Sequence, residues 1–261
     1  QEDTISILDT STTITYEYKN KFTNNTLDST HLTQIDKEFF KDESSFNKIK
    51  VGQITFEHKD KIKNSKLELT HLDKLAPEFF QDANSFNKLT PETTITYEHK
   101  NKIKIGTLTD LTKVTTAFFQ DDDSFNKLKS GTTISNANKD KIKNNALETS
   151  HLTRLAPNFF NDVNSFDKIK DGHLTFDHKK KLGTITDRAL LNKLENGFFR
   201  DNETFNKLSI KLEYEDANKI EDGKLTNLDK VATDFFQDTN SFNKLNSETK
   251  IPNIMKNKIQ N

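Results

Sequence analysis

The sequence of 261 residues predicts an α+β repeat protein, an open solenoid of six stacked units that each combine strands with a short helix or turn. Two recurring patterns predict this fold class. Pairs of adjacent Phe residues return in steps of 37 to 41 residues, and a third Phe follows six residues after each pair. The pairs lie at 39–40, 79–80, 118–119, 159–160, 198–199 and 235–236.

The Phe pairs divide the chain into tandem units with an atypical segment at each end. A unit of about 40 residues cannot bury its Phe residues alone, so neighbouring units must stack to form one continuous core. Residues 1–13 are expected to form a lead-in or cap, and residues 246–261 repeat the first half of a unit as a C-terminal cap. The six units are 14–53, 54–94, 95–133, 134–173, 174–211 and 212–245.

The first half of each unit predicts a strand. In the second unit it reads ITFEHKDKI from Ile54 to Ile62, and apolar and polar residues alternate at its start. A period of two is typical of a strand with one buried face.

The second half of each unit predicts a short helix or 3-10 turn. In the second unit Leu72, Leu75 and Phe79 follow one another at spacings of three and four, which places them on one face of a helix. Pro77 and, in the fourth unit, Pro157 lie inside this segment, and a Pro is not tolerated in the middle of a long helix.

The composition alone would indicate disorder. Hydrophobic residues make up 31% of the chain and charged residues 30%, whereas a globular domain is about 45–50% apolar. All 21 Phe residues nevertheless hold fixed places in the repeat, which predicts a thin core under a large polar surface. The predicted repeat core consists of Phe40, Phe46, Phe80, Phe86, Phe119, Phe125, Phe160, Phe166, Phe199, Phe205, Phe236 and Phe242.

Several classes of function are excluded or disfavoured by residue counts. The chain has no Cys, which removes disulfides, thiol catalysis and Cys-based metal sites. No apolar stretch approaches the roughly 20 residues needed to span a bilayer. A net charge of −1 argues against a nucleic-acid partner. No nucleophile elbow, phosphate loop or dinucleotide fingerprint is present, so we expect neither an enzyme nor a cofactor.

The second half of the unit resembles the BspA-type leucine-rich repeats of bacterial and protist surface proteins. Their phrase reads V-x-x-I-G-x-x-A-F-x-x-C-x-x-L-x-x-I, and SFNKL is similar to the SFNQ-x-L phrase of related repeats in mycoplasma-type surface lipoproteins. The resemblance implies a leucine-rich-repeat-like stack, although such repeats have about 20–29 residues. The matching places in the second unit are held by Leu72, Leu75, Ala76, Phe79, Phe80, Ala83, Phe86 and Leu89.

A closed six-unit ring or propeller is the alternative architecture, because six units near 40 residues also fit that period. A propeller blade needs four strands, however, and the spacing Leu-x-x-Leu-x-x-x-Phe-Phe is not that of a strand. The open solenoid is therefore the favoured prediction.

Recurrent polar residues are the candidate sites. An Asp follows each Phe pair by two residues, and Ser or Thr comes three residues later, which favours an Asp that caps a turn. The densest carboxylate group, formed by Asp121, Asp122 and Asp123, is the one candidate for Ca²⁺; otherwise no metal or catalytic residue is predicted.

Two further rows recur in the same registers. His residues share one register at 31, 71 and 151 and another at 58, 99 and 178, and surface positions are favoured over a metal site or a pH-sensitive row. A Lys row at 48, 88, 127, 168, 207 and 244 is interpreted as solvated.

These features predict a non-enzymatic repeat protein, extracellular or on a cell surface, that presents an extended face for protein or glycan binding and adhesion. No signal peptide is visible in the chain, so one is expected to have been removed. The alternative is a self-assembling structural subunit of a filament or surface layer, joined to copies of itself through its terminal repeats.

Overall fold

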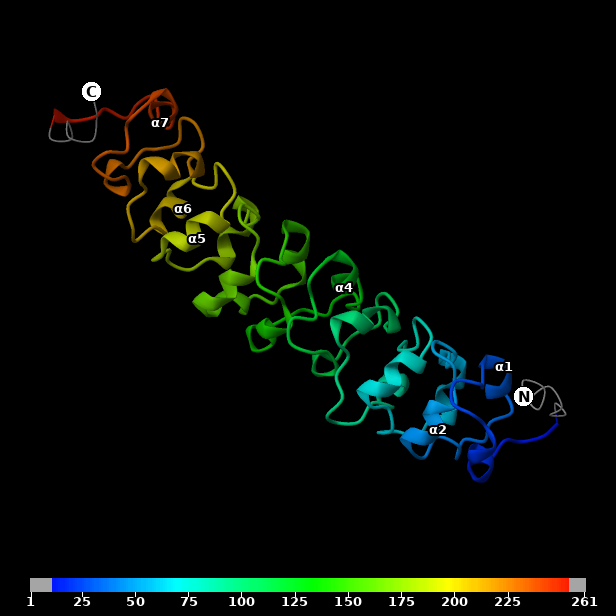
Figure 1. Cartoon of the computed structure of the whole chain (residues 1–261). Helices are drawn as coiled ribbons and strands as arrows, with labels where there is room; N and C mark the ends of the chain where they lie inside the picture. The colour runs from blue at the N-terminus through cyan, green and yellow to red at the C-terminus, as the bar shows by residue number, and fades with distance from the viewer. Residues whose placement is uncertain (1–10, 254–261) are drawn as a thin grey trace. The chain divides into compact units, whose positions relative to one another are not determined.

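The computed structural model describes residues 11–253 of the chain. The fold divides between Thr132 and Thr133 into two compact units, called here the N-terminal unit and the C-terminal unit. In Figure 1 the first runs from blue to green and the second from green to red. Of the predicted end segments, only residues 11–13 and 246–253 belong to the described part of the chain.

Short helices make up the regular structure of the described residues. The α-helices are α1 (Ser29–Leu32), α2 (Glu43–Asn47), α3 (Ala83–Phe86), α4 (Asp122–Asn126), α5 (Arg188–Lys193), α6 (Asn202–Asn206) and α7 (Thr239–Asn243). The 3-10 helices are η1 (Tyr16–Lys21), η2 (Phe56–Lys61), η3 (Leu69–Lys74), η4 (Tyr97–Lys102), η5 (Leu111–Lys113), η6 (Asn136–Lys141), η7 (Thr149–Arg154), η8 (Phe159–Asn161), η9 (Val163–Lys168), η10 (Phe176–Lys181), η11 (Tyr214–Lys219) and η12 (Leu228–Lys230).

The predicted strands are wrong, and with them the α+β class. Between residues 11 and 253 there is no β-strand, and each alternating segment contributes one residue to an isolated parallel bridge. Ile54 pairs with Leu75, Thr55 is extended, and the chain then turns into η2. The alternation spans too few residues to form a ladder, because the next six form the 3-10 helix. The alternative of a propeller is wrong for the same reason, since its blades are made of strands.

The bridges show that each 40-residue unit consists of two coils. Every bridge in the described residues is parallel and joins residues 19 to 23 positions apart, such as Ile54 with Leu75 and Leu67 with Leu89. A coil of about 20 residues therefore brings the chain back beside its own previous turn. The Phe pairs mark only every second coil, which explains why the sequence repeats at 40 residues.

Three columns of apolar residues form the core of each unit. A coil contributes one residue to each column, and nearly all of these side chains are buried. In the N-terminal unit the first column is Ile14, Ile35, Ile54, Leu75, Ile95 and Val114, the second is Leu27, Ile49, Leu67, Leu89, Leu108 and Leu128, and the third is Phe40, Ile62, Phe80, Ile103 and Phe119. The C-terminal unit repeats this arrangement.

The two rings of each Phe pair pack edge to face, and the third Phe lies against the second. In the second unit the centroids of Phe79 and Phe80 are 5.1 Å apart at 86°, and those of Phe80 and Phe86 are 5.1 Å apart at 24°. Eleven of the twelve predicted repeat-core Phe residues are no more than 9% exposed. The exception is Phe242, which is 38% exposed, and no described residue stacks on it as His71 stacks on Phe46.

An Asp caps the short helix after each Phe pair, as predicted. In α3 the Asp82 carboxylate accepts a hydrogen bond from the backbone N–H of Ser85 at 2.7 Å, and the Ser85 hydroxyl accepts one from the N–H of Asp82 at 3.1 Å. This reciprocal capping box satisfies two backbone donors that a helix start leaves free.

A regular loop joins the third column to the second in alternate coils. Its third residue has a left-handed backbone, at Asn25, Ser65, Gly106, Asn145 and Gly223. The N–H of Gly106 donates to the Asn126 carbonyl at the end of α4, at 2.9 Å. This turn thus donates a hydrogen bond to a carbonyl group at the end of the helix in the next coil. Gly adopts the required left-handed backbone without strain.

Half-buried lysines supply hydrogen bonds where the first column has no bridge. The first column is bridged only within each 40-residue unit. At the next step the Lys61 ammonium donates to the Ile35 carbonyl, and Lys102 donates to Leu75 O at 2.5 Å. In the C-terminal unit Lys219 donates to Leu194 O at 2.5 Å. A side chain thus takes the place of a backbone ladder bond.

Phe199, in the third column, should contribute much more to the free energy of unfolding than Phe242, the Phe that follows the pair in the sixth repeat. Phe199→Ala leaves a cavity in a fully buried site, so we expect a loss of about 3–5 kcal/mol in the free energy of unfolding. Phe242→Ala removes a partly exposed ring from the same C-terminal unit and should cost less than about 1.5 kcal/mol. Urea denaturation of the full chain measures both, and equal losses would contradict the packing described.

Lys102 offers a test of the ammonium-to-carbonyl contact. Burial lowers the pKa of Lys102, and Lys102→Met keeps the stem but leaves Leu75 O without this donor. We expect a loss of about 1–3 kcal/mol in urea denaturation. Lys104→Met is the matched control, since this exposed side chain reaches only the exposed Gln81 amide and should change stability by less than about 0.5 kcal/mol.

Candidate functional site

A cluster of one aromatic ring, one Lys and one Asp recurs on the surface of both units. Each cluster begins at the 3-10 helix that follows a first-column residue. In a 3-10 helix side chains three positions apart are eclipsed, so the Lys at the fourth position lies over the ring at the first. Lys19 lies 4.0 Å from the ring centroid of Tyr16, and Lys100 lies 4.0 Å from that of Tyr97.

The Asp of the cluster comes from the next coil and is the same residue that caps a helix. The Tyr97 hydroxyl donates to Asp121 Oδ2 at 2.6 Å, while Asp121 Oδ1 accepts the N–H of Ser124 at 2.9 Å. Burial by itself raises the pKa of Asp121, but these hydrogen bonds outweigh it and hold the pKa below its ordinary value. The carboxylate therefore stays charged at the surface.

The same geometry recurs in the other repeats with substitutions. Tyr16 and Lys19 both donate to Asp42, and Tyr214 donates to Asp238 at 2.7 Å. In the fourth repeat the aromatic position is Asn136, whose amide donates to Phe159 O at 2.7 Å. All five aromatic rings are half-buried rather than buried, namely Tyr16, Phe56, Tyr97, Phe176 and Tyr214.

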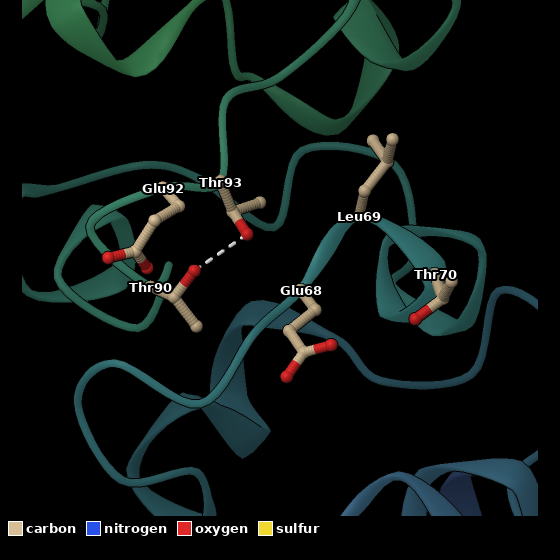
Figure 2. A pocket seen from close by; sticks show the side chains of 6 residues that line it. All are labelled: Glu68, Leu69, Thr70, Thr90, Glu92 and Thr93. Carbon is tan, nitrogen blue, oxygen red and sulfur yellow. Dashed lines mark hydrogen bonds between the residues drawn. The ribbon is translucent and has the colours of Figure 1, made fainter.

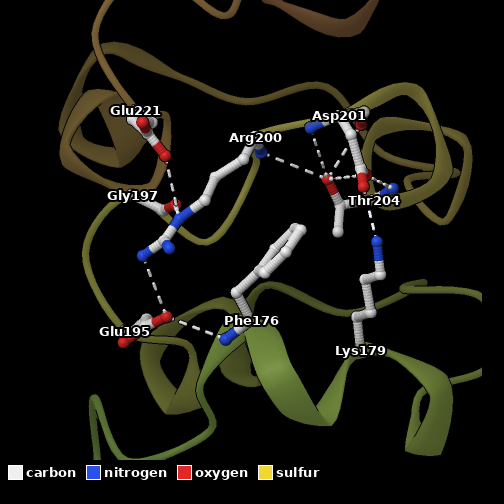
Figure 3. Close-up of polar contacts among 8 residues, drawn as sticks. All are labelled: Phe176, Lys179, Glu195, Gly197, Arg200, Asp201, Thr204 and Glu221. Atoms are coloured by element: carbon white, nitrogen blue, oxygen red, sulfur yellow. Dashed lines mark hydrogen bonds and ion pairs between the residues drawn. The ribbon is translucent and has the colours of Figure 1, made fainter.

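The cluster around Phe176 carries additional charges, as Figure 3 shows. Lys179 lies 4.3 Å from the ring centroid and donates to Asp201 at 2.5 Å. Arg200, one of three Arg residues in the chain, lies 5.1 Å from the same centroid and forms ion pairs with Glu195 at 3.2 Å and Glu221 at 2.9 Å. This cluster differs from its counterparts by a guanidinium and two carboxylates.

The Asp group proposed for Ca²⁺ is divided among other partners. Asp121 caps α4 and accepts from Tyr97, and Asp123 pairs with Lys127 at 3.2 Å and with Lys100 at 4.0 Å. Among residues 11–253 no three His, Asp or Glu side chains are grouped so that they could hold a metal ion.

The interpretation of the recurrent His residues as surface residues is wrong for His58, His71 and His151, which are buried, whereas His31, His99 and His178 are partly exposed as expected. The Nδ1 atom of His71 accepts the backbone N–H of Glu68 at 3.1 Å, and that of His58 accepts the N–H of Thr55 at 3.2 Å. The His178 Nδ1 lies 2.7 Å from the Thr175 hydroxyl. Both His58 and His71 are buried, and His71 stacks on Phe46 with centroids 4.0 Å apart.

The Lys row is not uniformly solvated, contrary to the prediction. Lys88, Lys127 and Lys244 are buried. Lys244 reaches Asp222 at 2.6 Å, and Lys207 donates to Leu182 O at 2.9 Å. The sequence signal for the last two contacts is weak, since Asp222 and Leu182 lie 22 and 25 residues away from their lysines, in another coil.

An open hollow of about 350 Å³ lies on the N-terminal unit, with Glu68, Leu69, Thr70, Thr90, Glu92 and Thr93 around it. Figure 2 shows its side chains, among which the Thr90 and Thr93 hydroxyls are 2.8 Å apart. Leu69 is 48% exposed at its edge. Its lining offers hydroxyls and carboxylates but no nucleophile paired with a base.

No family model, curated protein or solved structure matches this chain. The resemblance to BspA-type repeats therefore stays a prediction. No helix in residues 11–253 is long and apolar enough to cross a membrane.

Acid should weaken the fold before the carboxylates titrate. Burial lowers the pKa of His58, His71 and His178, so the folded chain takes up protons less readily than the unfolded chain. Their stabilising contribution is complete above the unfolded pKa of about 6.5 and is lost as pH falls below it. The depressed pKa values of Asp42 and Asp121 affect stability only below about pH 4.

The measurement is the urea midpoint of the full chain from pH 7.5 to pH 5.0 in roughly half-unit steps, which are enough to resolve a His titration. We expect the midpoint to fall with pH across this range. The control replaces the three His residues with Asn, the residue that the repeat itself carries at Asn138. A triple variant with the same pH dependence as the wild type would rule out these His residues as the cause.

Proposed function

We propose that this chain is a non-enzymatic repeat protein, extracellular or on a cell surface, that binds a protein or glycan ligand across an extended face. The observation that carries the proposal is the recurrence of the surface cluster, which has its ring, Lys and Asp together in the first, third and fifth 40-residue repeats. The resemblance to leucine-rich-repeat surface proteins supports the location.

The clusters offer several weak contacts of one kind. The complete clusters have a half-buried ring, an ammonium above it and a carboxylate beside it, as in Tyr97, Lys100 and Asp121. Contacts of this kind are individually weak because they are exposed to water. A ligand with a repeating structure can engage several of them together, and the affinity then exceeds that of one contact. A catalytic centre, by contrast, would need an acid, a base or a nucleophile at one particular place in the chain and not in every repeat.

The test is binding of the full chain to immobilised polysaccharides and matrix proteins, with collagen, fibronectin, cellulose and chitin as the initial probes. One variant removes the cluster of Tyr97 and Lys100 by substitution to Ala, a second removes Phe176 and Lys179, and a third combines both changes. We expect each pair to weaken binding about 3- to 10-fold and the combination to multiply the losses.

The matched control is Lys104→Ala with Lys129→Ala, which removes two exposed lysines outside the clusters. Binding that is unchanged in the combined variant, or reduced as much in the control, would contradict the proposal. The Asp residues are left in place because they also cap helices, so their loss would change stability.

Self-assembly through the terminal repeats is the second candidate, and the exposure of Phe242 favours it. Its five counterparts are no more than 9% exposed, whereas Phe242 presents 38% of its surface. Light scattering after size exclusion, over roughly a hundredfold range of concentration, distinguishes this candidate. Larger species that Phe242→Asp abolishes would support it, and a monomer throughout the range would exclude it.

A further inference from the structure

One loop of the C-terminal unit departs from the repeat. Four residues separate the third-column residue from the second-column residue in the regular loops, as between Ile62 and Leu67. Only Gly183 and Thr184 lie between Leu182 and Ile185. Residues 182–185 are called the short loop below. The short loop has no residue with a left-handed backbone, so it lacks the turn that each regular loop places against the next coil.

The preceding coil departs from the repeat at the same place. Where the other repeats have a five- or four-residue α-helix after the Phe pair, this coil has the 3-10 helices η8 and η9. Val163 begins η9 and is 61% exposed. The corresponding residues are Glu43, Ala83, Asp122, Asn202 and Thr239, so Val163 is the one large apolar side chain at this position.

The core is slightly less covered beside the short loop than elsewhere in the described repeats. Phe160 is 8% exposed, whereas Phe80, Phe119, Phe199 and Phe236 are each 0% exposed. Phe166 and Leu190 are 9% and 8% exposed. Leu190 holds the register in which His71 stacks on Phe46 in an earlier repeat.

These three side chains form the floor of a hollow of about 230 Å³. Val163 and the short loop flank it, and the rim carries the Thr184 and Thr186 hydroxyls, the Asn161 amide and the Asp187 carboxylate. One carboxylate oxygen of Asp187 already accepts the N–H of Ala189 at 2.9 Å. No Lys or Arg lines the hollow, so its chemistry does not suit an anion.

We propose that this hollow is a binding site for one pyranose ring of a glycan. The volume lies below the roughly 300–1,000 Å³ of pockets for drug-sized ligands, so it accommodates a single ring. A pyranose has an apolar C–H face for the floor formed by Phe160, Phe166 and Leu190. Its hydroxyl edge can exchange hydrogen bonds with Thr184, Thr186 and Asn161. Burial of the ring's apolar face would remove the exposed edges of the Phe side chains from water.

This site deepens the proposed function, and it rests on that proposal only in the choice of ligand class. The surface clusters recur and would hold a repeating ligand, whereas the hollow occurs once. A single ring site would fix where along the face a glycan end or branch is held.

The test is a titration of the isotope-labelled full chain observed by methyl and amide NMR. The probes are the methyl glycosides of glucose, mannose and N-acetylglucosamine, each added to roughly 50 mM, since a ligand of this size is expected to bind with a Kd on the order of millimolar. We expect one of them to shift the methyl signals of Val163 and Leu190 and the amide signal of Thr184 in a saturable way. The Val51 methyls, 65% exposed in the N-terminal unit, are the internal control.

Two variants test the site itself. Replacement of Gly183 and Thr184 by the four residues of positions 63–66 restores a regular loop, and should abolish the saturable shifts while leaving the urea midpoint unchanged or higher. Thr186→Val keeps the shape of the side chain but removes its hydroxyl, and should weaken binding about 3- to 10-fold.

The proposal is overturned if none of the three glycosides shifts these signals, or if the regular-loop variant responds as the wild type does. It is also overturned if N-acetyl-phenylalanine amide shifts them and the glycosides do not, since the hollow then takes a peptide side chain. The proposed function is tested separately, by the cluster variants. If those variants lose binding but the hollow binds no sugar, only the present inference is overturned.

Discussion

The structure depends on pairing between coils through single residues. At each bridge one residue exchanges two backbone hydrogen bonds with the adjacent coil, as when Ile54 N–H donates to Lys74 O and Ile54 O accepts from Ala76 N–H. A strand ladder would satisfy many more backbone groups in one run. Because a buried backbone group without a partner is costly, the remaining groups of each 20-residue coil must be satisfied by other means. The 3-10 helices, the Asp caps and the half-buried lysines provide them.

The same requirement produces the surface clusters. A capping Asp uses one carboxylate oxygen for the helix start and has the other available for a side chain of the previous coil. Where a Lys lies above the ring, as Lys100 lies above Tyr97, it is placed there by the 3-10 turn that follows the bridge residue. The candidate face is thus a consequence of how the backbone is satisfied, and its recurrence follows from the recurrence of the coil. The capping Asp residues would serve both stability and the proposed binding, whereas the rings and the lysines above them can be varied with less effect on the fold.

The sequence predicted the core and the caps but not the coil. Phe spacing locates buried side chains because burial of a large apolar group dominates the choice of residue, and Asp before Ser marks a helix start through local contacts alone. The strand prediction failed because Ile54 and Thr55 do alternate, yet the local 3-10 turn from Phe56 takes over before a ladder can form. The roles of Lys61 and His71 depend on Ile35 and Phe46, which belong to other coils, and no local pattern encodes such contacts.

A site that occurs only once in the chain is therefore best sought where a coil departs from the repeat. A regular loop places a left-handed turn against the neighbouring coil and closes the core, as at Gly106 and Asn145. The short loop omits that turn, and beside it Phe160 and Phe166 are 8% and 9% exposed, the highest values among the repeat-core Phe residues of the described chain apart from Phe242. Apolar surface held open to water is a free-energy cost that a bound ring would recover. The short loop makes this coil differ from the others. That difference is the reason for proposing a binding site here and not a further copy of the repeated surface.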